Sequence, residues 1–471
     1  MQSKSVYKPN FLQNRVLVRR WKNLDIDAFR SDLQSSHLFS LKVSSDNASN
    51  LAQLVSTYYS VLSSLVNKHA PLVLLKPCSR STVPWFNRDI SNAIRERRRC
   101  ERIWRRTRCE SDRSHFVTQR NYVQLLIRRA KLSHYSNIVS NSTCNAKSVW
   151  PAIRSLLCRK KSPILPSHVS KSDLPSAFAE HFHAKISSIR DNLLPSCMER
   201  IGGTNCTEKT CLSQFSDVTV TETESVMLSM KPTSCSLDPA PTWLVKMFIS
   251  DLAPIFCSIA NLSLQSGIFP DSEKRAVVTP LIKKGRLCKN SFVNYRPISS
   301  LSFLSKFIER LVARRMTNFL RFHNLFSPFQ SAYRKGHSTE TVLTHLFNAL
   351  TEARETHRSS CVTFLDLSAA FDTVDHVILL ERLSYPFNVN SIAHNWFSSY
   401  LSHRYQRVII DGLSSSWCEV KQGVPQGSVL GPLLFTLYIS PISDLIFSFG
   451  LSHHTVYMLM TFVYFLSLIH I

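Results

Sequence analysis

The sequence predicts an α+β fold in which a helical, basic N-terminal region precedes a domain that mixes strands and helices. Three observations support this prediction. Apolar residues recur near the helical period through residues 21–70. Arginines crowd a second helical pattern between Arg80 and Lys131, and Val362–Leu365 has the composition of a strand. At 471 residues the chain exceeds one compact core, so we expect two or three domains.

The charge balance indicates a polyanionic partner. Lys and Arg total 57 against 32 Asp and Glu, which gives a net charge of +25. A field of this size attracts nucleic acid first and an anionic membrane surface second. Hydrophobic residues make up 44% of the chain, which is enough to bury real cores and argues against global disorder.

The cysteines and the N-terminus indicate an intracellular protein. The 13 cysteines are dispersed, with neither a CxxC pair nor zinc-binding spacing, which is typical of reduced thiols rather than a disulfide framework. Met1–Arg20 contains no signal-peptide core. We therefore expect the protein in the nucleus and cytoplasm, not secreted, and without stable membrane association.

The N-terminal region, residues 1–135, is predicted to be helical. Its first helical pattern is interrupted by a polar break at Ser44–Asn50, and a proline-bounded loop follows at Pro71–Pro84. Between Arg80 and Lys131 there are 15 Lys and Arg against 5 Asp and Glu, a local charge of +10. Residues 136–270 are less regular, with helices expected over 147–157 and 171–189 and a helix start at 221–224.

One segment of the basic region is predicted to contact nucleic acid. Residues 95–108 hold eight arginines in fourteen positions, far denser than helical i,i+4 pairing requires. Guanidinium groups attract phosphates whatever the base sequence, so a nucleic-acid backbone is the expected ligand. The alternative is an ordinary solvated helix face. The predicted contacts are Arg95, Arg97, Arg98, Arg99, Arg102, Arg105, Arg106 and Arg108.

The central motif is Phe364–Asp372, which reads FLDLSAAFD. Asp366 falls where the predicted strand ends, and a carboxylate there is well placed to hold Mg²⁺, which prefers hard oxygen ligands. Phe371, five residues on, is expected to return toward the same site. Taken alone, an aspartate after a strand is more often structural or a helix cap.

The second motif is Gln422–Pro432, which reads QGVPQGSVLGP. Its glycines and prolines predict a loop that another backbone can approach closely, followed by a helix from Leu433. A plain turn before a helix would have the same composition.

Three further blocks precede these motifs: AVVTPLIKK at 276–284, NYRPIS at 294–299 and FQSAYRKGHSTET at 329–341. In this order, the blocks resemble the polymerase domain of non-LTR (LINE-type, jockey-like) retrotransposon reverse transcriptases. The resemblance implies an RNA-directed DNA polymerase and an incomplete right-hand (fingers–palm) domain over 271–445. A group II intron or telomerase relative fits the spacing of the central motif, but fits the Tyr295 and Gly423 blocks less well.

The resemblance also assigns the flanking regions. Residues 1–135 are similar to the connector between the family's endonuclease and polymerase, and 136–270 to an N-terminal extension or linker. Residues 446–471 form an apolar tail. The implied partners are an RNA template, a DNA primer and dNTPs.

Roles follow by resemblance for individual residues. Asp366 would bind both catalytic Mg²⁺ ions, helped by the backbone carbonyl of Leu367. Phe371 would select dNTPs by clashing with a ribose 2′-hydroxyl.

Four further residues would contact the nucleotide. Arg296 and Arg334 would contact the incoming triphosphate, because guanidinium forks suit phosphate oxygens. Gln426 and Gly427 would lie under the templating base pair.

The chain departs from the family at the next motif, Tyr-Ala-Asp-Asp. Residues 453–461 read HHTVYMLMT, so Leu459 and Met460 stand where two metal-binding aspartates belong. Residues 457–461, Tyr-Met-Leu-Met-Thr, can be encoded by TAT ATG CTG ATG ACN, where the Tyr and Leu codons are assumed. Read from the third base of the Tyr457 codon, that string is TAT GCT GAT GAC, which encodes Tyr-Ala-Asp-Asp. We therefore expect a frameshift before Tyr457, an out-of-frame tail, impaired Mg²⁺ binding and a truncated, catalytically defective chain.

Two alternatives to this interpretation remain. The tail could be a membrane anchor, but its apolar run of about 14 residues is shorter than the ~20 needed to span a bilayer. The chain could also be a non-catalytic RNA-binding protein that uses the arginines of 95–108 and the finger residues.

Overall fold

The computed structural model divides the chain into two compact units. Unit 1 combines Met1–Arg19 with Leu72–Ile164, and unit 2 combines Arg20–Pro71 with Leu165–Ile471. The structure describes residues 16–40, 47–75, 84–140, 165–192, 211–233, 235–327, 330–357, 359–367, 369–442, 445, 456–458 and 461–468.

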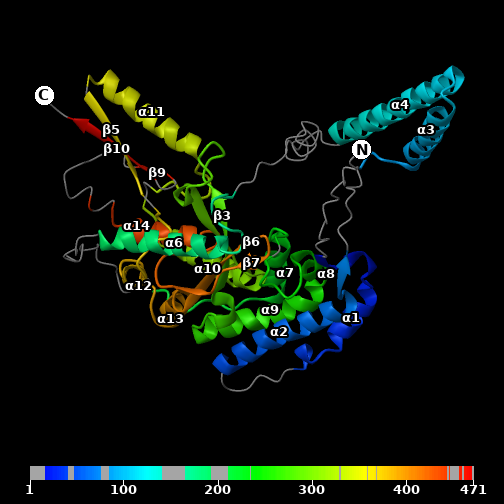
Figure 1. The fold of residues 1–471 in the computed structure, drawn as a ribbon. Helices are drawn as coiled ribbons and strands as arrows, with labels where there is room; N and C mark the ends of the chain where they lie inside the picture. The colour runs from blue at the N-terminus through cyan, green and yellow to red at the C-terminus, as the bar shows by residue number, and fades with distance from the viewer. Residues whose placement is uncertain are drawn as a thin grey trace. The chain divides into compact units, whose positions relative to one another are not determined.

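Unit 1 contains a helical hairpin and a two-stranded sheet. The strands β1 (Val16–Arg19) and β2 (Leu72–Leu75) pair antiparallel. The hairpin consists of α3 (Arg88–Thr107) and α4 (Glu110–Ser140). The Asn87 side chain accepts the Ile90 N–H at the start of α3, and Arg108 ends it in the left-handed conformation. The predicted basic helices are confirmed (Figure 1).

The two helices of the hairpin pack through a small apolar seam. Ile90 and Ala93 of α3 and Val123 of α4 are buried. Farther along, the rings of Trp104 and Phe116 stack with centroids 5.4 Å apart. The seam occupies one side of α3, and the arginines of this helix other than the half-buried Arg97 are exposed.

The first helices of the chain belong to unit 2. The buried faces of α1 (Ile26–Gln34) and α2 (Asn47–His69) pack on α9 (Ile249–Ser266) and on Phe248, which precedes α9. Phe29 stacks on Phe248 at 5.0 Å, and Tyr58 meets Phe256 edge-on at 5.2 Å. The expected boundary at residue 135 therefore does not match the two units, because residues 20–71 share the core of the later domain.

Unit 2 contains eight further α-helices among its described residues. They are α6 (Leu174–Asp191), α7 (Val220–Ser229), α8 (Thr242–Met247), α10 (Phe303–Phe322), α11 (Thr339–Glu355), α12 (His376–Ser384), α13 (Ser391–Leu401) and α14 (Gly431–Ile439). Short 3-10 helices span Trp21–Asn23, His37–Phe39, Asp271–Lys274 and Phe292–Asn294. One apolar core joins α1, α2, α7–α10 and α12–α14. The helix expected from Leu433 starts two residues earlier, at Gly431.

A five-stranded mixed sheet lies beside this core. Its strands are β3 (Arg275–Ile282), β4 (Tyr295–Ser300), β6 (Arg404–Ile410), β7 (Leu413–Ser414) and β8 (Cys418–Val420). β3 pairs antiparallel with β4 and parallel with β6, and β7 and β8 both pair with β6. The sheet is covered by α6, whose Phe178 packs with Tyr295 and Val408.

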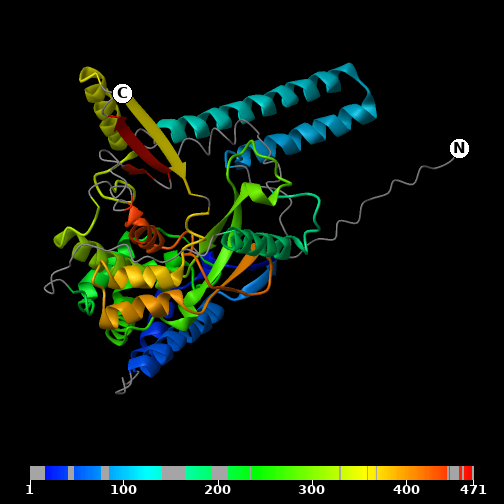
Figure 2. The same cartoon turned by 90° about the vertical axis from the view of Figure 1, so that its left-hand side faces the viewer.

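A second, three-stranded sheet carries the central motif. β5 (Ser359–Asp366) pairs antiparallel with β10 (Thr461–Leu468), which pairs with β9 (Val456–Met458). Figures 1 and 2 both show α11 alongside β5. The predicted strand before Asp366 is confirmed, and Asp366 is its last residue. Among the described residues, no helix is both long and apolar enough to cross a bilayer.

Candidate active site

The end of β5 is flanked by the hairpin of β9 and β10. Thr461 is the partner of both Asp366 and Met458 in the strand registers. Between these strands the sequence is Leu459-Met460, which lies outside the described residues. The register thus brings the end of β5 level with the start of β10. The family resemblance implies two aspartates just before that start, at positions 459 and 460.

The residues available here do not fit a site for two Mg²⁺ ions. Asp366 supplies one carboxylate, whereas Leu459 and Met460 carry an alkyl group and a thioether. Mg²⁺ requires hard oxygen donors, and two ions ~3.5–4 Å apart need more than one carboxylate between them. Within the described part of the chain, no group of three or more His, Cys, Asp or Glu is arranged to hold a metal.

A tight turn follows β5. The carbonyl of Ala369 accepts the N–H of Asp372 at 2.8 Å and of Thr373 at 3.1 Å. This turn directs Phe371 into the main core, where its side chain is 7% exposed. Its ring centroid lies 5.1 Å from that of Phe435 and 6.4 Å from that of Tyr333. Leu367, before the turn, packs half-buried against the same core.

The glycine-rich loop is bound to this turn by backbone hydrogen bonds. The Gly423 N–H donates to Val374 O at 2.7 Å, and the Val424 N–H donates to Phe371 O at 2.8 Å. A Cβ on Gly423 would lie 2.7 Å from Asp372 O. The close backbone approach expected from the motif is therefore present, and its partner is the turn after β5.

The same loop is bound to β4 on its other side. The Ser299 N–H donates to Gln426 O at 2.8 Å. A Cβ on Gly427 would meet Ser299 O at 2.3 Å, so only glycine fits there. Gln426 and Gly427, predicted to lie under the templating pair, are thus held against the five-stranded sheet.

A buried carboxylate that the sequence reasoning missed fixes the end of this loop. Glu309 of α10 accepts the N–H of Val429 at 2.6 Å and of Leu430 at 3.3 Å, just before α14. It also accepts the Tyr400 hydroxyl at 3.2 Å. Complete burial raises the pKa of Glu309, while nearby Arg404 opposes that shift. The only signal in the sequence was an acid on an otherwise apolar helix face.

Arg404 is a second buried charge beside the loop. Its side chain is 2% exposed, with the guanidinium carbon 4.6 Å from the centre of the Tyr400 ring. Nη1 donates to Tyr400 O at 2.8 Å, whereas Nη2 is buried and makes no hydrogen bond within the described structure.

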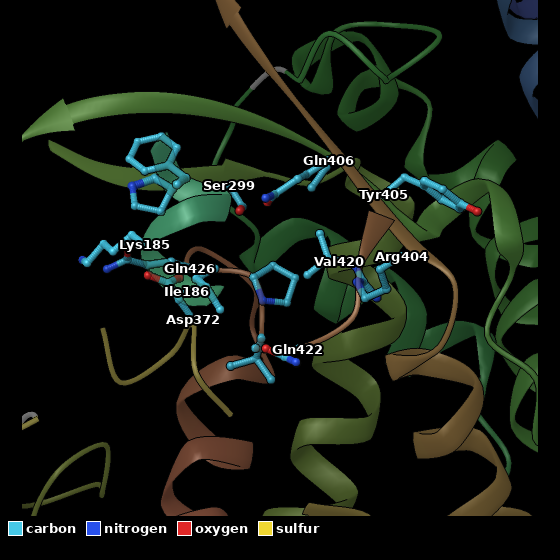
Figure 3. A pocket seen from close by; sticks show the side chains of 16 residues that line it. Lys185, Ile186, Ser299, Asp372, Arg404, Tyr405, Gln406, Val420, Gln422 and Gln426 are labelled. Atoms are coloured by element: carbon cyan, nitrogen blue, oxygen red, sulfur yellow. The ribbon is translucent and has the colours of Figure 1, made fainter. Parts of the chain in front are cut away.

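A pocket lies where the loop, the turn, β6 and α6 meet (Figure 3). Lys185, Asp372 and Gln426 lie together on one side of it, and Arg404 lies on the opposite side. Burial raises the pKa of Asp372 to about 6, although the nearby Lys185 ammonium acts to lower it. Asp372 is thus a carboxylate that folding takes out of water with one cation near it.

The arginines predicted to contact the triphosphate lie in two places. Arg296 is exposed on β4, near Lys283. Burial, together with the charges of Lys185 and Arg296, lowers the pKa of Lys283, so three cations influence this end of the sheet. Arg334 is half-buried, with Nη1 3.4 Å from Ser327 O, and lines a pocket shared with the start of α14.

The arginines predicted to contact nucleic acid lie in unit 1. Arg97 is half-buried and the other seven are exposed. Two of them make ion pairs within α3: Arg105 with Glu101 at 2.6 Å and Arg99 with Glu96 at 3.8 Å. The remaining positive charge is not neutralised within the helix, because α3 carries eight arginines and three acids over residues 88–107.

Comparison with known families identifies part of this chain. Residues 282–460 match the family described as "Reverse transcriptase (RNA-dependent DNA polymerase)". This region is a reverse transcriptase domain. It contains the NYRPIS and FQSAYRKGHSTET blocks and the two motifs, and it begins within the AVVTPLIKK block. The predicted α+β fold with a helical N-terminal region and a polymerase domain is confirmed.

The chain is also similar to polymerases of non-LTR transposons. It is 25% identical over 440 residues to the probable RNA-directed DNA polymerase from transposon X-element of Drosophila melanogaster, covering 90% of this chain and 46% of that protein. It is 34% identical over 184 residues to the RNA-directed DNA polymerase from mobile element jockey of the same species, covering 39% and 20%. The chain therefore spans less than half of these relatives.

We predict that Gly423→Ala destabilises the chain far more than Gly412→Ala. Both glycines have nearly the same positive φ, +83° and +85°, but a Cβ at Gly412 meets nothing within 4 Å. Gly412→Ala should cost about 1 kcal/mol for its backbone conformation. Gly423→Ala should cost roughly 1–3 kcal/mol more, because its Cβ collides with the turn. Urea unfolding of both variants tests this, and equal losses would contradict the close approach.

We predict that Asp372→Asn stabilises the chain at neutral pH. Because burial raises the pKa of Asp372 from 3.8 to about 6, the folded state binds more protons than the unfolded state between these values. Stability from this group therefore falls as the pH rises from about 4 to 6. The variant's advantage in unfolding free energy should grow from below about 1 kcal/mol at pH 4 to about 2–3 kcal/mol at pH 7. A difference that does not change with pH would refute the assignment.

Proposed function

We propose that this chain is the polymerase portion of a non-LTR retrotransposon protein that keeps its nucleic-acid and nucleotide contacts but cannot polymerise. The observation that carries this proposal is the number of carboxylates at the end of β5. The end of β5 lies level with the start of β10, yet the sequence offers one carboxylate there, Asp366. In an intact relative, divalent ions held at this place would activate the primer hydroxyl and steady the leaving pyrophosphate.

The chain's own residues support substrate binding more than catalysis. Arg296, with Lys283 nearby, and Arg334 beside the loop would attract the triphosphate of a dNTP. Gln426 and Gly427 would support the templating base pair from their fixed place against β4. Phe371, in the turn after β5, would limit the space for the sugar of the nucleotide.

Loss of activity should be near-complete. Phosphoryl transfer needs enough negative charge to hold two ions at a short separation. Asp372 follows the same turn as Asp366, but it lies in the pocket with Lys185 and Gln426. It is not placed on a separate strand, so it cannot replace the lost ligands. We propose Mg²⁺ as the metal of the intact site because carboxylate oxygens are its preferred donors.

A second candidate function is non-catalytic RNA binding. The observation that favours it is the exposure of seven of the eight arginines on α3. These side chains would contact an RNA backbone without any polymerase chemistry. An RNA template and a DNA primer are the partners that we propose for the polymerase portion, whereas RNA alone would be the partner in this second case. We place the protein in the nucleus and cytoplasm, where nucleic-acid substrates are found.

We predict that the chain as written does not extend a DNA primer on an RNA template. Restoring the frame before Tyr457, and continuing through the downstream DNA, should return two aspartates and with them extension. The measurement is primer extension with dNTPs and Mg²⁺, run on both proteins side by side. Extension by the chain as written would overturn the proposed defect. Genomic DNA that does not encode Tyr-Ala-Asp-Asp in the shifted frame would overturn the frameshift.

We predict that the arginines of α3 supply much of the RNA affinity. Replacing Arg97, Arg98, Arg99, Arg105 and Arg106 by Gln should weaken RNA binding at low salt and flatten its salt dependence, because fewer counterions are released. The same five positions changed to Lys form the control, since charge is kept and the salt slope should persist. If the RNA affinity and its salt dependence are unchanged in the Gln variant, the arginines form only a solvated helix face and do not contact RNA.

A further inference from the structure

Helix α6 lies outside the matched reverse transcriptase domain, which begins at residue 282, yet it contacts the candidate site. We propose that α6 is a positioning element of the polymerase site, in which Lys185 and Arg190 hold the turn after β5 against the glycine-rich loop. This inference rests on the proposed function, because positioning presupposes a polymerase site.

The first half of α6 is anchored on the five-stranded sheet. Phe178 is fully buried, and its ring lies 4.7 Å from that of Phe292 and 5.0 Å from that of Tyr295, edge-on in both cases. Leu174 and Phe182 are buried in the same cluster. Aromatic contacts of this kind fix where the helix lies on the sheet.

The last turn of α6 reaches the segment after the central motif. Arg190 Nη2 lies 2.7 Å from Asp375 Oδ2, and both side chains are at most 30% exposed. Asp375 also accepts the N–H groups of Val377 and Ile378, so it starts α12. One carboxylate therefore joins α6 to the helix that follows the turn.

A second cation of α6 faces the turn itself. Lys185 and Asp372 line the same pocket, and Figure 3 shows them on one side of it beside Gln426. The two cations lie five residues apart on α6, and the two carboxylates lie three apart in the turn. Burying a carboxylate lowers the free energy of unfolding unless a positive group lies near it. The two cations of α6 therefore favour one position of the turn, in which each lies near a carboxylate.

In this position, the turn accepts hydrogen bonds from the glycine-rich loop. The carbonyls of Phe371 and Val374 accept the N–H groups of Val424 and Gly423, and His376 Nε2 lies 2.8 Å from Gly423 O. The sheet therefore fixes the position of α6, α6 fixes the position of the turn, and the turn fixes the position of the loop that contains Gln426.

Hydrogen exchange of the full chain tests this proposal without any need for catalysis. Arg190→Gln removes the ion pair with Asp375, and Lys185→Gln removes the cation near Asp372. Each change should make the amides of Gly423 and Val424 exchange roughly three- to tenfold faster, because the loop loosens locally. Arg190→Lys should largely restore the slow exchange. Lys171→Gln, an exposed cation just before α6, is the control and should change nothing.

A double-mutant cycle identifies the partner. Asp375→Asn keeps the cap of α12, since asparagine also caps helices, but removes the charge. In that background, Arg190→Gln should add no further exchange at the loop. Unchanged loop exchange in the single variants would overturn the proposal, as would equally faster exchange throughout α9, which would show a general loss of stability. Failure of primer extension has no bearing on these readouts, so the two proposals fail separately.

Discussion

The site depends on the close backbone contacts of the glycine-rich loop. On one side the loop meets the turn after β5, and on the other it meets Ser299 of β4. Both contacts need positions without a Cβ, at Gly423 and Gly427, because backbone carbonyls occupy that space. The turn, the sheet and α14 can take only a narrow range of relative positions while these contacts hold.

Buried charge reinforces that arrangement at a cost in stability. Glu309 accepts the amides before α14, and Arg404 stacks on Tyr400 beside it. Asp372 is withdrawn from water with Lys185 nearby. A buried carboxylate lowers stability near neutral pH, whereas replacement by a neutral group removes that penalty. Such residues are better explained by the geometry they impose on the loop than by a gain in folding free energy.

In the proposed function, binding and chemistry depend on different residues of this chain. Its cations remain: Arg296 and Lys283 on the sheet, and the exposed arginines of α3 in unit 1. Of the carboxylates that the family resemblance implies at the metal site, the sequence carries Asp366, with Leu459 and Met460 at the other two positions. Long-range attraction needs only net positive charge, whereas metal binding needs specific oxygen donors. The proposed change at residues 459–460 would therefore remove metal binding and leave the attraction in place.

The sequence by itself determined the α+β class, the strand that ends at Asp366, the tight loop at Gly423–Gly427 and the basic helices. These features depend on local composition and on motif order, which a linear chain displays directly. Only the tertiary structure showed that residues 20–71 share the later core, that Glu309 fixes the loop and that α6 reaches the turn. These facts depend on contacts between residues more than 100 positions apart, and no periodicity along the chain records which distant side chains meet.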